Sequence, residues 1–205
     1  PTKLEVPGEV EYAGRGVSYC AVCDGAFFKG ETLAVIGGGD AAVEEAEYLT
    51  RYGAKVYVIH RRGEFRASKL LQERLFANPK VEVIWNKRVR EFKGGPAGLQ
   101  SVELQDMLTG EHSSLAATGA FIFIGFRPNT GLVKQHAEHD PNGYLVTDDR
   151  MMTSIPGLFA AGDVRAQLTR QITTAVGDAT TAAIAVEKYL TDRRSRLESK
   201  AKVGV

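Results

Sequence analysis

A glycine-rich turn between a predicted strand and a predicted helix constrains the fold of this chain most strongly. Residues 32–36 are apolar and β-branched and predict a buried strand, while residues 40–52 have the composition of a helix. The pattern Gly37-x-Gly39-x-x-Ala42 lies between them. Such glycines allow a tight turn and a close approach of backbone to a pyrophosphate. An ordinary strand–helix turn is the alternative, and the context favours a dinucleotide site.

The segments around this turn extend it into an α/β domain. Gly53 is expected to cap the first helix. Further strands are predicted at 55–60, 81–85 and 120–124, a second helix at 68–77, and antiparallel strands at 88–92 and 99–106. Residues 32–124 therefore predict β-α-β-α-β with a β-meander, a Rossmann-like nucleotide-binding domain.

The pattern changes after Gly125. Residues 126–190 contain irregular segments, a short apolar run at 157–161 and a long helix from about 170 to 190. Residues 191–205 carry five basic residues and little apolar content, which favours a solvated, flexible tail. We expect domains at 1–125 and 126–190, followed by this tail.

The end of the second strand indicates which nucleotide binds. NAD sites usually place a carboxylate there for the ribose hydroxyls. This chain has His60, Arg61 and Arg62 instead, with Arg66 close behind. Guanidinium groups pair strongly with a 2′-phosphate, which a carboxylate would repel. The prediction is NADP(H), with a solvated basic turn as the alternative.

Composition excludes several other classes. Apolar residues make up 43% and charged residues 25% of the chain, the usual mix of a globular protein. A net charge of +1 gives no indication of a nucleic-acid or membrane-surface partner. No apolar run is long enough for a membrane helix, and the start of the chain does not resemble a signal peptide.

The two cysteines form a Cys20-x-x-Cys23 motif, followed by Asp24. Haem attachment needs a histidine next, and zinc needs further ligands that the four histidines do not supply at a matching spacing. A redox-active dithiol fits best, with Asp24 passing protons, and two inert buried cysteines are the alternative. Because a nicotinamide donates a hydride that a disulfide accepts poorly, a flavin site is also expected.

Five ordered motifs resemble low-molecular-weight thioredoxin reductases, over about residues 4–190. They are GVSYCAVCDG at 16–25, VIGGGD at 35–40, HRR with FRA at 60–67, IG with PNT at 124–130, and AAGDV at 160–164 followed by Arg170-Gln171. Asp178-Ala179 follows Gly177 where this family commonly has another glycine.

The resemblance implies a flavoprotein with two dinucleotide-binding domains, whose NADPH domain is inserted between the halves of its FAD domain. Residues 4–124 would be the NADPH domain and 126–190 the second half of the FAD domain. The first half, with its own glycine motif, is expected to be absent from this chain. We therefore expect the chain alone to be colourless, to bind NADPH and not to turn over.

The resemblance also implies residue roles. Cys23 would face the flavin, Cys20 would attack the partner's disulfide, and Asp24 would be the acid and base. The implied cofactor-binding residues are Gly37, Gly38, Gly39, Asp40, Ala41, His60, Arg61, Arg62, Arg66, Gly125, Gly162, Asp163, Arg170, Gln171 and Ile172. No metal site is expected.

The implied enzyme is a cytoplasmic homodimer that passes electrons from NADPH through FAD and the dithiol to a thioredoxin-like protein. The stretch around Gly125 would be one of two hinges between its domains. Two alternatives to an active thioredoxin reductase stay open. The first is a non-catalytic NADPH-binding fragment of that enzyme, and the second is part of a related flavoprotein that reduces peroxiredoxins.

Overall fold

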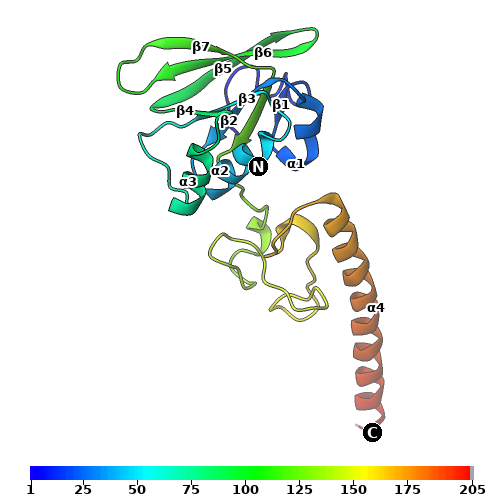
Figure 1. Ribbon diagram of the computed structural model, residues 1–205. Helices are drawn as coiled ribbons and strands as arrows, with labels where there is room; N and C mark the ends of the chain where they lie inside the picture. The colour runs from blue at the N-terminus through cyan, green and yellow to red at the C-terminus, as the bar shows by residue number, and fades with distance from the viewer. Residues whose placement is uncertain (204–205) are drawn as a thin grey trace. The chain divides into compact units, whose positions relative to one another are not determined.

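A computed structural model describes residues 1–203 of the chain, and side chains as far as residue 199. The chain divides into two compact units, Pro1–Phe126 and a second from Arg127 onward. In Figure 1 the first unit runs from blue to green and the second from yellow-green to red. Each unit is described separately below.

A five-stranded parallel sheet forms the centre of the first unit, with strand order β1-β8-β2-β3-β4. The strands are β1 (Val17–Ser18), β2 (Thr32–Gly37), β3 (Lys55–Ile59), β4 (Val81–Ile84) and β8 (Gly119–Phe123). Strand β2 is buried from Leu33 to Gly37 because layers cover both faces of the sheet. The strands predicted from the apolar runs are therefore confirmed.

The helices cover one face of this sheet (Figure 1). They are α1 (Ala21–Asp24), η1 (Gly25–Phe28), α2 (Asp40–Leu49) and α3 (Lys69–Phe76). Helix α2 ends at Leu49, three residues before the predicted end at Tyr52. Gly53 still donates its amide to the Leu49 carbonyl at 2.9 Å, but a Cβ there would lie 3.0 Å from Leu33 Cδ1. A larger residue here would therefore crowd Leu33 of β2.

An antiparallel meander covers the other face (Figure 1). Its strands are β5 (Lys87–Gly95), β6 (Gly98–Asp106) and β7 (His112–Ala116). Buried residues of the meander, among them Phe92 and Val102, pack against Ile36 and Ile122 of the sheet. The sequence predicted β5 and β6 but not β7, whose residues are exposed apart from the half-buried Leu115.

A buried carboxylate holds the first residues of this unit in place. Glu9 is 1% exposed, and its carboxylate accepts hydrogen bonds from the amides of Leu4 and Glu5 at 3.0 and 2.6 Å. It also accepts one from the Tyr19 hydroxyl at 2.8 Å. These three donors satisfy the buried charge, which would otherwise be costly. The segment before β1 is thus fixed to the residue that precedes Cys20.

The second unit is mostly irregular and contains one long helix. Its elements are η2 (Gly131–Val133), η3 (Gly162–Val164) and α4 (Ile172–Val203), around a small core of Ala137, Leu145 and Ala160. Helix α4 continues to Val203, so residues 191–203, which the sequence assigned to a solvated tail, are helical. Residues 191–203 contain neither glycine nor proline, so nothing in them ends a helix. No helix among residues 1–203 is long and apolar enough to cross a membrane.

The buried Glu9 gives a stability prediction. Glu9→Ala leaves two amides and the Tyr19 hydroxyl without their acceptor. An unsatisfied buried donor costs about 1–3 kcal/mol, and these three donors are only partly buried, so we expect a total loss of about 3 kcal/mol in unfolding free energy. Urea titration of the variant measures it. Glu73→Ala on the exposed surface of α3 is the control, and an equal loss in both variants would contradict the role of Glu9.

Candidate functional site

The dithiol lies directly after β1. Cys20 and Cys23 form a disulfide, with their Cα atoms 5.3 Å apart. Cys20 is the N-cap of α1, and the Cys23 amide donates to its sulfur at 3.1 Å. Cys23 is exposed, and Val22 and Phe27 nearby are 59% and 82% exposed. The predicted disulfide is therefore confirmed, and it lies beside apolar side chains that a partner protein can reach.

Ser18 organises the acid next to the dithiol. Its hydroxyl donates to the Asp24 carboxylate at 2.7 Å and accepts from the Cys20 amide at 3.1 Å. Both Ser18 and Asp24 line a small cavity of about 170 Å³, together with two glycines, two phenylalanines and Val17. Sequence reasoning missed Ser18, because no pattern distinguishes a serine at a strand end. The one sequence signal for Ser18 was its position two residues before Cys20.

Tyr19, the residue directly before Cys20, is held in place by contacts of its own. Burial, and then the hydrogen bond to the Glu9 carboxylate, raise the pKa of Tyr19 well above its usual value. The Lys3 ammonium lies 3.8 Å from the centre of the Tyr19 ring. The residues on both sides of the strand end thus anchor the backbone that leads into the disulfide.

The glycine turn has the close contacts that its motif predicts. A Cβ on Gly37 would lie 2.5 Å from the Phe123 carbonyl oxygen, and one on Gly38 would overlap the His60 ring. A Cβ on Gly39, the N-cap of α2, would point into open space. The backbone at Gly39 and the exposed Ala41 is therefore accessible to a phosphate, which helix N-termini favour.

The arginine segment after β3 is attached to the glycine turn by two hydrogen bonds. The Arg66 amide donates to the Gly38 carbonyl at 2.8 Å, and the Ser68 amide donates to the Asp40 carboxylate at 2.7 Å. Asp40 therefore connects two segments of the protein. Arg61, Arg62 and Arg66 are exposed, and within the described residues none of them forms an ion pair. Their positive charge is available to an anion beside the turn.

His60 lies beneath the glycine turn. The sequence expected it beside the 2′-phosphate, but its side chain is buried and its Nε2 atom has no hydrogen-bond partner among the described residues. Burial is the main cause that lowers the pKa of His60, against the opposing effect of contacts with the Gly37 and Glu64 backbone. The ring therefore supports Gly38 from below as a neutral group.

Four of these features share one edge of the sheet. The dithiol follows β1, Gly125 follows β8, the glycine turn follows β2 and the arginine segment follows β3. All these strands are parallel, so their carboxyl ends meet at the same edge, where open α/β sheets bind ligands. β1 and β2 are two strand spacings apart, about 10 Å. The fold thus gathers the dithiol and the nucleotide turn along one rim.

The remaining predicted residues lie in the second unit. Asp163 is exposed in η3, after Gly162, whose positive φ of 74° favours glycine. The Asp178 carboxylate accepts from the Gly162 amide at 3.0 Å and pairs with Arg165 at 2.7 Å. The Asp178 carboxylate therefore holds the loop that presents Asp163.

The start of α4 combines a cation with an apolar surface. The Arg170 guanidinium lies 3.8 Å from the centre of the Tyr144 ring, and its buried Nε atom has no hydrogen-bond partner among the described residues. Gln171 and Ile172 are exposed, Ile172 by 83%. The start of α4 therefore presents exposed polar and apolar side chains next to the guanidinium of Arg170.

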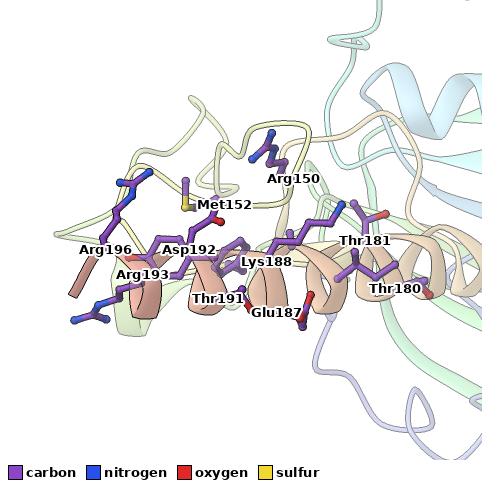
Figure 2. Close-up of a pocket in the computed structure, with 14 residues that line it drawn as sticks. Arg150, Met152, Thr180, Thr181, Glu187, Lys188, Thr191, Asp192, Arg193 and Arg196 are labelled. Carbon is purple, nitrogen blue, oxygen red and sulfur yellow. Dashed lines mark hydrogen bonds between the residues drawn. The ribbon is translucent and has the colours of Figure 1, made fainter. Parts of the chain in front are cut away.

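A larger groove of about 890 Å³ lies between α4 and the loop around Met152 (Figure 2). Arg150, Arg193 and Arg196 line it together with Lys188 and Tyr189, and none of the predicted site residues does. In the part of the chain that the structure describes, no group of three or more acidic, histidine or cysteine side chains is placed to hold a metal ion.

Comparisons with known proteins agree with this geometry. Residues 1–179 match the family described as pyridine nucleotide-disulphide oxidoreductase. Thioredoxin reductase of Bacillus subtilis is 48% identical over 197 residues, which are 96% of this chain and 62% of that protein. The solved thioredoxin reductase from Streptococcus pyogenes has a TM-score of 0.90 at 52% identity, covering 93% of this chain and 62% of that one. The chain thus spans about three fifths of the length of these relatives.

The buried His60 gives a pH prediction. Its pKa in the folded state lies below the unfolded value near 6.5, so unfolding takes up a proton as the pH falls. We expect stability to be highest above about pH 6.5 and to fall below it. His60→Gln should reduce this slope, measured by urea unfolding between pH 5 and 8. The exposed His112→Gln is the control, and an unchanged slope in His60→Gln would exclude this origin.

Proposed function

Because this chain belongs to the pyridine nucleotide-disulphide oxidoreductase family, we propose that it carries the NADPH site and the dithiol of a thioredoxin reductase. The observation that carries the proposal is the shared rim of the sheet. On this rim, the disulfide and the glycine turn lie two strands apart. The glycine turn is hydrogen-bonded to the arginine segment, whose exposed guanidinium groups form no ion pair among the described residues. The overall reaction converts NADPH, a proton and a disulfide into NADP⁺ and a dithiol.

NADPH binding follows from the two bonded segments. The open backbone at Gly39 and the start of α2 would receive the pyrophosphate, as the motif predicts. Arg61, Arg62 and Arg66 would pair with the 2′-phosphate, because guanidinium groups match phosphate geometry. His60 contributes by supporting the turn from below. Asp40 contributes through its bond to Ser68, which fixes the distance between the two segments.

FAD would accept the hydride of NADPH and pass the two electrons on to the disulfide. In the second unit Asp163 would bind the ribityl–phosphate region, on the loop held by Gly162 and Asp178. Arg170, Gln171 and Ile172 would line the ring system at the start of α4. Gly125, with φ of 115° and its carbonyl bonded to the Thr2 amide at 2.9 Å, would act as a hinge.

The cysteines would have different roles in exchange with a partner. The Cys20 thiolate would attack the partner's disulfide and release one partner thiolate, which takes up a proton. The Cys23 thiolate would then attack the mixed disulfide and release the second. Asp24 would supply and accept the protons, since its carboxylate is fixed close to the loop by Ser18. A thioredoxin-like protein fits the exposed Val22 and Phe27 beside the disulfide. Cytoplasmic location and a homodimer stay predictions.

Nucleotide preference tests the site. Losing a guanidinium–phosphate hydrogen bond costs about 1.5–3 kcal/mol. Arg61→Ala and Arg62→Ala should therefore each weaken NADPH binding about ten- to a hundredfold and leave NADH binding unchanged. Isothermal titration calorimetry with both nucleotides measures this. The exposed Arg90→Ala in the meander is the matched control. Equal losses for NADPH and NADH would exclude the 2′-phosphate role.

Mixed-disulfide trapping tests the thiol assignment. The Cys23→Ser chain lacks its resolving thiol, so it should form a covalent 1:1 adduct with an oxidised bacterial thioredoxin through Cys20. Intact mass spectrometry under non-reducing conditions detects this adduct. The Cys20→Ser chain is the control and should form much less. The opposite result would reverse the roles of the two cysteines, and adducts with neither would exclude the dithiol as the exchange site.

A further inference from the structure

Ser18 joins the two ends of the four-residue disulfide loop through one hydroxyl group. It accepts a hydrogen bond from the amide of Cys20, where the loop begins, at 3.1 Å. It donates one to the carboxylate of Asp24, immediately after Cys23, at 2.7 Å. The Asp24 amide also donates to the Cys20 carbonyl at 3.1 Å, so the loop is closed by backbone and side chain together.

The hydroxyl group is held by a rigid element. Ser18 is 5% exposed, and its strand β1 pairs in parallel with β8, opposite Phe121. The next residue, Tyr19, is anchored to the buried Glu9. The Ser18 side chain is therefore fixed to the sheet, and its bond to Asp24 requires that Asp24 stays close to Cys20.

The hydrogen bonds of Ser18 affect the equilibrium between the disulfide and dithiol forms of Cys20 and Cys23. A disulfide forms more readily when the two sulfurs are already held close, because the effective concentration of one thiol near the other is high. Without the disulfide, the backbone bond and the Ser18 hydroxyl still help to hold the loop closed. Removing the hydroxyl destabilises the closed loop that the disulfide needs.

We propose that Ser18 is a positioning residue of the dithiol, which favours the disulfide form by holding Cys20 and Asp24 in the closed loop. The proposal rests on the proposed function only in taking Cys20 and Cys23 as the redox pair. Ser18 acts through the residues at the two ends of the loop, Cys20 and Asp24.

The test is a thiol–disulfide equilibrium of the 205-residue chain with glutathione, which needs neither NADPH nor flavin. Two reduced glutathione molecules convert the protein disulfide into a dithiol and become one oxidised glutathione. Alkylation of the free thiols and intact mass give the two protein forms. Ser18→Ala should shift the equilibrium about three- to tenfold toward the dithiol, where tenfold corresponds to about 30 mV for this two-electron couple.

Two variants separate positioning from general stability. Ser114 on β7 also donates to a carboxylate at 2.7 Å, that of Glu103, in the meander. Ser114→Ala therefore removes a similar bond away from the dithiol and should leave the equilibrium unchanged. Ser18→Thr retains the hydroxyl and should return the equilibrium toward the wild-type value.

A wild-type equilibrium constant in folded Ser18→Ala would overturn the proposal, even if its unfolding free energy falls. Should that variant not fold, hydrogen exchange of the oxidised wild-type chain decides. The Cys20 amide should be protected there and lose protection on reduction, and equal exchange in both forms would overturn the proposal. A wild-type chain that forms no reversible disulfide with glutathione would instead contradict the proposed function itself.

Discussion

The close approach of backbone at the carboxyl end of β2 is the constraint on which the first unit depends. Gly37 lies against the Phe123 carbonyl, Gly38 lies on the His60 ring, and the Gly38 carbonyl accepts from the Arg66 amide. A side chain at Gly37 or Gly38 would push apart β2, β8 or the arginine segment. The same contacts that let the sheet pack therefore set the position of the cationic segment beside the exposed turn.

Sequence periodicity predicted the parallel sheet well, because strands covered on both faces are continuous apolar runs such as Leu33–Ile36. Sequence periodicity failed for elements whose residues are mostly exposed and therefore show no apolar pattern. Strand β7 is an exposed edge of polar residues, and α4 extends past residue 190 without any stop signal in the sequence. The expected cap differs too, because Thr50 is the C-cap of α2 and Gly53, without a positive φ, packs close to Leu33.

Motifs located the site but did not show how its residues are supported. The Cys20–Cys23 disulfide could be predicted from spacing, and the positions of Arg61 and Arg62 from the end of a strand. Ser18, Glu9 and Asp178 could not, because their partners are distant in sequence or belong to loops without periodicity. His60 was expected beside the 2′-phosphate, and its ring lies buried under Gly38, a placement that only the packing at this turn decides.

The hydrogen bond between the Thr2 amide and the Gly125 carbonyl brings the chain's entry into the first unit next to its exit. Domains with adjacent ends tolerate transplantation into loops of other proteins, because the host need only open by a few ångströms. The ends of the first unit are therefore close enough for its insertion into a loop of another protein. Grafted into a surface loop of an unrelated scaffold, it would bring a dithiol and a dinucleotide turn together as a single insert.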